Sequence, residues 1–155
     1  MTPGINIAKK AGIAHTVHEY AHDSSSASYG LEAAEKLGVP EDRVFKTLVV
    51  TLNNDALAVA VLPVSSMLSM KLMAKAAGAK KAVMADQADV ERATGYVLGG
   101  VSPLGQKKRL KTIIDSSARA FSTIYVSAGR RGLEIELNAS DLARLVGGRF
   151  AGVCQ

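Results

Sequence analysis

Residues 44–63 read VFKTLVVTLNNDALAVAVLP, and this stretch decides the fold. Its first part, residues 44–52, is rich in apolar and β-branched residues and predicts a strand. The polar triplet at 53–55 predicts a short hairpin turn. The last part, residues 56–63, is almost entirely apolar, and such a run predicts a central strand that is buried on both faces. A buried hairpin is therefore expected to anchor the sheet.

Helix caps and glycine stops divide the rest of the chain into short elements. Helices are predicted at 3–11, 28–37, 70–77, 87–93 and 141–146, with Thr2, Ser69, Asp86 and Ser140 as N-terminal caps. Strands are predicted at 16–20, 83–84, 112–115, 123–126, 133–137 and 149–153, and a polar loop at 22–26. Strands in hairpin-spaced pairs, with helices set apart, predict an α+β fold with a mixed, mostly antiparallel sheet.

The composition is that of an ordinary globular protein. A chain of 155 residues predicts a single domain, 1–155. The net charge of +5 favours an anionic partner, although a mildly basic surface would also explain it. One cysteine, Cys154, permits no internal disulfide, and no apolar run reaches the ~20 residues of a membrane span. With no signal-peptide pattern either, the chain is expected to be cytoplasmic and not to engage a membrane.

A glycine-rich loop is the main candidate for a binding element. Residues 95–109 read GYVLGGVSPLGQKKR. Glycines let a backbone approach a ligand closely and can offer bare N–H groups to a carbonyl or phosphate oxygen. The loop is not a nucleotide-binding P-loop, because Gln106 stands where that motif requires lysine. The basic residues that follow form either a solvated face or a set of phosphate contacts: Lys107, Lys108, Arg109 and Lys111.

Lys46 stands out in its strand because it shares a face with apolar residues such as Leu48 and Val50. A surface lysine that extends its ammonium to water and an active-site cation both fit this pattern. Glu134 and Glu136 share one face of their strand, which is read as an exposed acidic face.

The histidines and the cysteine suggest no metal site and no nucleophile. His15, His18 and His22 lie within eight residues, but no set of Asp, Glu or Cys completes a zinc site. Cys154 is expected at a frayed terminus, where nothing nearby would lower its pKa. We therefore expect no metal, no cofactor and no protein nucleophile.

The chain closely resembles the YbaK-type deacylases, free-standing relatives of the prolyl-tRNA synthetase editing domain. The segments that carry the resemblance occur in the same order in that family: 44–48, the glycine loop through 111, 112–115, 124–127 and 131–137. The family fold is a mixed, barrel-like sheet with helices around it. The resemblance implies removal of a wrong amino acid from tRNA, chiefly cysteine from tRNA(Pro) and also from tRNA(Cys), with attack by the substrate's own thiol. It also implies aminoacyl-tRNA as substrate and prolyl-tRNA synthetase as a partner.

The resemblance assigns roles to residues of this sequence. The expected catalytic group comprises Lys46, Tyr20, Gly99 and Gly100, and the expected substrate-binding group comprises Tyr29, Thr47, Ser102, Pro103, Ser127 and Glu134. Lys107, Lys108, Arg109 and Lys111 are expected to guide the tRNA. Two positions depart from the family pattern: Tyr29 stands where phenylalanine is expected, and Glu134 where aspartate is expected.

Elementary chemistry agrees with this reading. A thiol tethered to the ester carbonyl gains a large effective molarity, so proximity can replace a protein nucleophile. Backbone N–H groups of the glycine loop would stabilise the charge on the carbonyl oxygen. A non-catalytic module that binds tRNA or a synthetase is the alternative, because the basic cluster by itself requires no more than binding.

Overall fold

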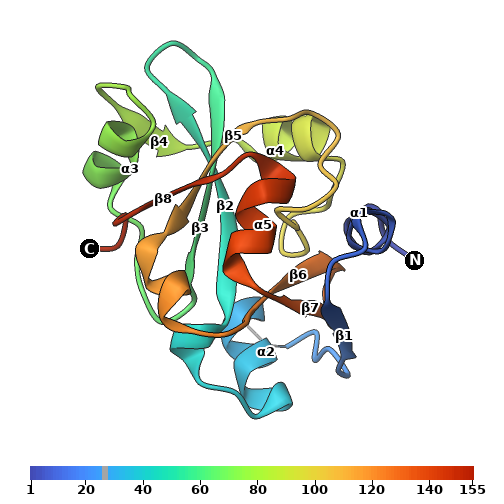
Figure 1. The fold of residues 1–155 in the computed structure, drawn as a ribbon. Helices are drawn as coiled ribbons and strands as arrows, with labels where there is room; N and C mark the ends of the chain where they lie inside the picture. Colours follow the sequence, from blue (N-terminus) through green and yellow to red (C-terminus); the bar gives the residue numbers. More distant parts are fainter. Residues whose placement is uncertain (26–27) are drawn as a thin grey trace.

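The computed structural model describes residues 1–25 and 28–155, and it shows two β-sheets with helices packed around them (Figure 1). Ser26, in the predicted polar loop at 22–26, lies outside the described residues. The helices are α1 Pro3–Ala11, α2 Tyr29–Leu37, α3 Met70–Ala76, α4 Gln87–Thr94 and α5 Ala139–Val146, with two 3₁₀ turns, η1 Glu41–Arg43 and η2 Ser116–Ala120. The strands are β1 His15–Glu19, β2 Phe45–Leu52, β3 Leu57–Pro63, β4 Ala82–Met84, β5 Lys111–Asp115, β6 Ile124–Arg130, β7 Leu133–Leu137 and β8 Arg149–Ala151.

The predicted hairpin lies in the middle of the larger sheet, whose strand order is β4-β2-β3-β5-β8. β2 and β3 pair antiparallel, from Phe45 opposite Pro63 to Thr51 opposite Leu57. β4 pairs antiparallel with β2, whereas β5 and β8 add parallel strands beyond β3. Every residue of β3 after Leu57 is buried. The predicted central strand is therefore confirmed.

The smaller sheet, of order β1-β7-β6, is antiparallel throughout. An isolated parallel bridge between Val44 and Tyr125 links it to the larger sheet, and the two sheets do not close into a barrel. β6 changes register between Ser127 and Arg130, and such an irregularity bends a strand and disrupts its pairing. The α+β fold with a mixed, mostly antiparallel sheet is confirmed, but the barrel-like sheet is an open pair of sheets.

Capping residues set the helix limits close to those predicted. The Ser28 and Ser69 hydroxyls accept hydrogen bonds from the first turns of α2 and α3. The prediction for α5 was wrong: Asn138 is its cap, with Oδ1 accepting from Ser140 N at 2.9 Å and Asp141 N at 3.2 Å. Asparagine is as good an N-cap as serine, and the helix begins two residues earlier than predicted. Within the described chain, no helix has the length and apolarity to cross a bilayer.

The larger sheet is buried on both faces. One face, with Phe45, Val49 and Val61, packs against the smaller sheet and α5. The other face, with Val50 and Leu62, packs under α3. Because successive side chains of a strand point to opposite faces, neighbours in β2 enter different environments.

The C-terminal segment is tied down, so the frayed end expected around Cys154 was wrong. Val153 N donates to Asp115 Oδ1 at 3.0 Å, and Val153 O accepts from Ser69 N at 2.8 Å. Gln155 N also donates to the carbonyl of Met67 at 2.9 Å. Burial raises the pKa of the Cys154 thiol, which makes it a weak nucleophile for a different reason.

Candidate active site

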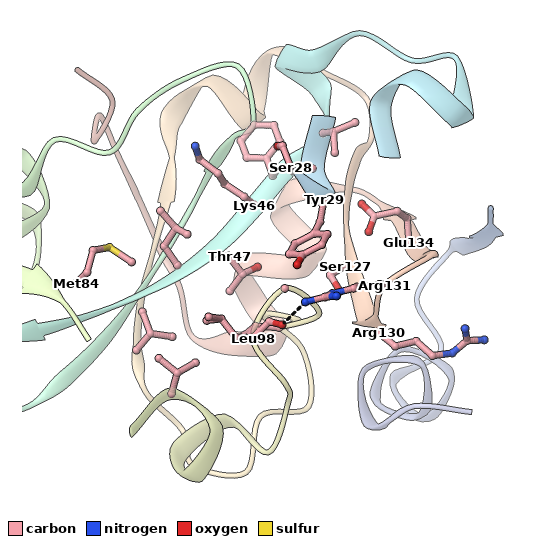
Figure 2. A pocket seen from close by; sticks show the side chains of 18 of the residues that line it. Ser28, Tyr29, Lys46, Thr47, Met84, Leu98, Ser127, Arg130, Arg131 and Glu134 are labelled. Carbon is pink, nitrogen blue, oxygen red and sulfur yellow. Dashed lines mark hydrogen bonds between the residues drawn. The ribbon is translucent and has the colours of Figure 1, made fainter. Parts of the chain in front are cut away.

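A cavity of about 350 Å³ opens where four segments meet: the start of β2, the start of α2, the glycine-rich loop after α4, and the β6–β7 hairpin (Figure 2). Seven of the ten residues predicted to act on or bind the substrate line it: Tyr20, Tyr29, Lys46, Thr47, Gly99, Ser127 and Glu134. They come from segments far apart in sequence, and the fold brings them together at the edge between the two sheets.

The other three predicted residues, Gly100, Ser102 and Pro103, are buried outside the cavity lining. Ser102 Oγ accepts from Leu104 N at 3.1 Å, within the loop itself. Gly100 N donates to the carbonyl of Val97 at 2.9 Å. The amide of Gly100 is therefore occupied by a turn, and it would have to leave that turn to bind a ligand oxygen.

Gly99 lies at the cavity edge, where both its backbone conformation and its neighbours disfavour a side chain. Its φ of +92° is in the left-handed region. A Cβ there would lie 2.6 Å from Tyr29 Cε2 and 2.9 Å from the guanidinium of Arg131. The glycine thus lets the loop approach the aromatic wall of the cavity directly.

Lys46 lies at the cavity but does not point into its centre. Its Nζ donates to the carbonyl of Ser66 at 2.7 Å, and Figure 2 shows it directed away from Tyr29 and Glu134. As predicted, Lys46 follows the face of Leu48, which packs with the cluster under α3. Burial lowers its pKa, and the nearby Cys154 opposes this shift. Lys46 is thus a half-buried cation at the cavity rim, held by a hydrogen bond to a backbone carbonyl.

Thr47 points the other way, into the cavity (Figure 2). Within the described structure its Oγ1 is buried and has no hydrogen-bond partner. A buried hydroxyl without a partner costs roughly 1–3 kcal/mol, which a bound polar group would recover. The Thr47 hydroxyl is therefore a buried polar group at the cavity that still has its hydrogen-bonding capacity among the described residues.

Glu134 contradicts the expectation of an exposed acidic face, because it is only 7% exposed. Burial raises its pKa to about 8, so a large share of the carboxyls hold a proton at neutral pH. Glu136, on the same strand face, is held by His18 Nε2 at 2.9 Å and by the hydroxyl of Thr123 at 2.5 Å. Although burial opposes it, these hydrogen bonds lower the pKa of Glu136. One acid of the pair is structural, and the other faces the cavity without such support.

The two tyrosines form the aromatic part of the wall. Burial and the negative charge of Glu134 raise the pKa of Tyr20 to about 12, so its hydroxyl stays protonated. The Tyr29 ring lies under Arg131, whose Cζ is 3.8 Å from the ring centroid. The edge of Tyr29 also meets the His22 ring, at 5.7 Å between centroids.

The predicted tRNA-guiding cluster lies away from the cavity. In the described structure, its lining includes none of these basic residues: Lys107, Lys108, Arg109 and Lys111. The amides of Lys107 and Lys108 donate to carbonyls at the end of α4, and Lys111 Nζ donates to the carbonyl of Ala77 at 2.9 Å. These hydrogen bonds therefore give part of the basic run a structural role: they fasten the loop to the end of α4 and β5 to the end of α3.

Sequence reasoning missed the arginines of the β6–β7 hairpin, Arg130 and Arg131. The sequence analysis includes Arg131 in the segment 131–137 that carries the family resemblance, but it assigns neither arginine a role. Both residues line the cavity, and Arg131 also donates from an NH2 group to the carbonyl of Leu98 at 3.4 Å. The signal was available in the sequence, because two adjacent arginines at a hairpin tip are exposed cations next to a strand that carries Glu134.

A model of the family described as an aminoacyl-tRNA editing domain matches residues 25–145. The chain belongs to this family. It is therefore an aminoacyl-tRNA deacylase, and the editing family acts on the ester that joins an amino acid to tRNA. Of the two functions expected from the sequence, family membership supports the enzyme and not the non-catalytic binding module.

Individual relatives agree with the family. The chain is 38% identical over 152 residues to the Enterococcus faecalis protein named "Putative Cys-tRNA(Pro)/Cys-tRNA(Cys) deacylase EbsC", covering 98% of this chain and 92% of that protein. It is 28% identical over 121 residues to YwhH of Bacillus subtilis, covering 78% and 76% of the two chains.

Solved structures show the same fold. The crystal structure of hypothetical protein APE2540 superposes with a TM-score of 0.88 at 25% identity, covering 99% of each chain. A "putative trans-editing enzyme for prolyl tRNA synthetase" superposes with a TM-score of 0.87 at 18% identity, covering 99% of this chain and 95% of that one. The second likeness shows the editing-domain fold.

Proposed function

We propose that this protein acts in trans on cysteine mischarged onto tRNA(Pro), as a single editing domain over residues 1–155. The cytoplasm, where tRNA is charged, is the expected compartment, and prolyl-tRNA synthetase is the expected partner. The observation that carries the proposal is the cavity itself. It joins the buried Glu134 carboxyl and the unsatisfied Thr47 hydroxyl inside a mainly apolar wall. Such a site suits a small aminoacyl group with one polar head.

The proposed nucleophile is the substrate's own thiol. Among the described lining residues there is no cysteine and no histidine, so Ser127 has no imidazole beside it to act as a base. Ser127 Oγ instead accepts a hydrogen bond from Gly129 N at 3.1 Å. In the proposed step the cysteinyl thiolate attacks the ester carbonyl and forms the S–C bond. The C–O bond to the ribose then breaks, the ribose oxygen takes a proton, and a cyclic thioester leaves.

Each of the cavity residues would have its own role in binding the substrate or in stabilising charge. Glu134 and Thr47 would hold the α-amino group, Tyr20 and Tyr29 would enclose the side chain, and Lys46 would turn from Ser66 towards the ester oxygen. A cation beside the carbonyl oxygen stabilises the charge that develops there. Because only the correct side chain carries a thiol, the chemical step would discriminate where a small pocket can separate substrates by only ~1–3 kcal/mol.

A deacylation panel tests this proposal. tRNA(Pro) charged with cysteine, alanine, proline or 2-aminobutyrate is incubated with catalytic amounts of the protein. We expect multiple turnovers with cysteine and none with 2-aminobutyrate, which matches the cysteine side chain in size but lacks a thiol. Equal rates with both would overturn the thiol-assisted step, although not the deacylase activity itself.

The role of Lys46 is tested with a matched pair of variants. Lys46→Ala is expected to lower kcat about a hundredfold or more, by the size of an oxyanion-stabilising group. Lys71→Ala, an exposed lysine on α3, is the control and should leave kcat unchanged. An unchanged rate for Lys46→Ala would show that the lysine only ties β2 to Ser66.

A further inference from the structure

Arg131 is held over the mouth of the cavity by two contacts. Its guanidinium lies 3.8 Å above the centre of the Tyr29 ring, a cation–π geometry. It also donates to the carbonyl of Leu98 at 3.4 Å, which ties the hairpin to the glycine-rich loop (Figure 2). Gly99 leaves the space in which this stack forms, since a Cβ there would lie 2.9 Å from the guanidinium. The Arg131 side chain is therefore exposed to solvent, but these two contacts fix its orientation.

Most N–H donors of the Arg131 guanidinium make no hydrogen bond to the described residues. An arginine carries five N–H donors, and in the described structure Arg131 uses one of them to donate to the carbonyl of Leu98. In the described structure no carboxylate lies within ion-pair distance of it, whereas its neighbour Arg130 lies 3.9 Å from Glu19. Figure 2 shows Arg130 pointing away from Tyr29 and Arg131. Of the two adjacent cations, Arg131 is the one that is available to an anion at the cavity.

The position of Arg131 at the cavity rim suits a phosphate of the tRNA acceptor end. In an aminoacyl-tRNA the first phosphodiester lies one nucleoside away from the ester. With the aminoacyl group among Thr47 and Glu134 in the depth of the cavity, that phosphate reaches the rim and not the depth. A guanidinium fork matches the paired oxygens of a phosphate. The predicted lysine cluster lines no part of the described cavity, whereas Arg131 does.

Resting on the proposed function, we propose that Arg131, stacked on Tyr29, binds the phosphodiester next to the terminal adenosine of the substrate. The acceptor end would then enter between the glycine-rich loop and the β6–β7 hairpin. Arg131 is a positioning residue, because it touches the substrate one nucleoside away from the reacting atoms.

The test compares two substrates that differ in this phosphate. Cysteinyl-tRNA(Pro) carries it, and 3′-O-cysteinyl-adenosine does not. For Arg131→Gln we expect kcat/KM to fall about tenfold on the tRNA and to remain unchanged on the nucleoside. The salt dependence of kcat/KM on the tRNA should also weaken, by about 0.7 in the slope of the logarithms, as one single-stranded phosphate contact is lost. Arg144→Gln, an exposed arginine on α5 that pairs with Asp141 and lies outside the cavity lining, is the matched control and should change neither ratio.

Each other outcome has a defined meaning. Equal losses on tRNA and nucleoside would show that Arg131 only supports the loop, and this would overturn the inference. Loss of the salt slope in a Lys107→Gln, Lys108→Gln double variant, with Arg131→Gln unaffected, would place the phosphate on the lysine cluster and would also overturn it. If the wild type turns over neither substrate, the proposed function fails, and that result is distinct from both.

Discussion

Lys46 and Thr47 are neighbours in β2, but they face two different kinds of environment. Behind the sheet, Lys46 donates to a carbonyl, and Asp115 accepts hydrogen bonds from Ser117 and Val153. In front of it, Thr47 has no partner among the described residues, and Glu134 is buried without an ion pair there. The polar groups behind the sheet are satisfied within the fold, whereas these two groups in front of it face the cavity without a side-chain partner among the described residues. Uncompensated burial of this kind is typical of functional sites.

The largest stability effect is expected behind the sheet. Asp115→Ala removes the acceptor of three hydrogen bonds, from Ser117 N, Ser117 Oγ and Val153 N. The unfolding free energy should fall by about 3 kcal/mol, measured by urea denaturation. Activity per folded molecule should be retained. Asp89→Ala, which removes an exposed pair with Arg92, should cost about 0.5 kcal/mol or less.

Glu134→Gln is expected to lower the activity and to change how the stability depends on pH, whereas Asp115→Ala lowers only the stability. In the wild type, folding raises the pKa of this carboxyl from 4.5 to about 8. The folded state therefore binds a proton that the unfolded state has released, so stability falls as the pH rises from 4.5 to about 8. Glu134→Gln should lack this fall, while deacylation drops about ten- to a hundredfold. A parallel pH dependence of stability in the two proteins would contradict the buried carboxyl.

Gly99→Ala tests the close approach of the loop to the Tyr29–Arg131 stack. The left-handed φ alone costs an alanine about 1 kcal/mol, and the contacts at 2.6 and 2.9 Å add to it. We expect a stability loss of about 1–2 kcal/mol and a larger loss of deacylation on tRNA. Gly38→Ala is the control, since its φ is +69° but nothing lies within 4 Å of the added Cβ. Equal activity of the two variants would show that the stack has no role.

The smallest effect is expected from Thr47→Val. Removing a hydroxyl that has no partner should leave the unfolding free energy unchanged or raise it by about 1 kcal/mol. KM should rise about fivefold, because the substrate loses its partner. Thr112→Val is the comparison: its buried hydroxyl donates to the carbonyl of Leu110 at 3.1 Å, so this variant should lose about 1 kcal/mol. A stability loss in Thr47→Val would show that the hydroxyl has a partner in solution.

Much of the fold and part of the site were predictable. The 44–63 hairpin, the helix starts and the glycine stops follow from local propensity and capping, which short stretches of sequence encode. The cap of α5 was misplaced, because asparagine and serine compete for the same role two residues apart. The resemblance assigned all ten site residues; seven of them line the cavity, whereas Gly100, Ser102 and Pro103 lie outside its lining. A loop presents its residues to different sides, and sequence does not show which.

The sequence by itself determined the elements and their faces, because strand and helix periodicity fix where each side chain points. It placed Lys46 and Leu48 together and set Glu134 and Glu136 on one face of their strand. Only the tertiary structure decided what covers each face: Glu136 meets His18 and Thr123, whereas Glu134 is enclosed in the cavity. It also brought Arg131 over Tyr29, across about a hundred residues of chain. Such pairings depend on how the two sheets meet, and no local pattern records that.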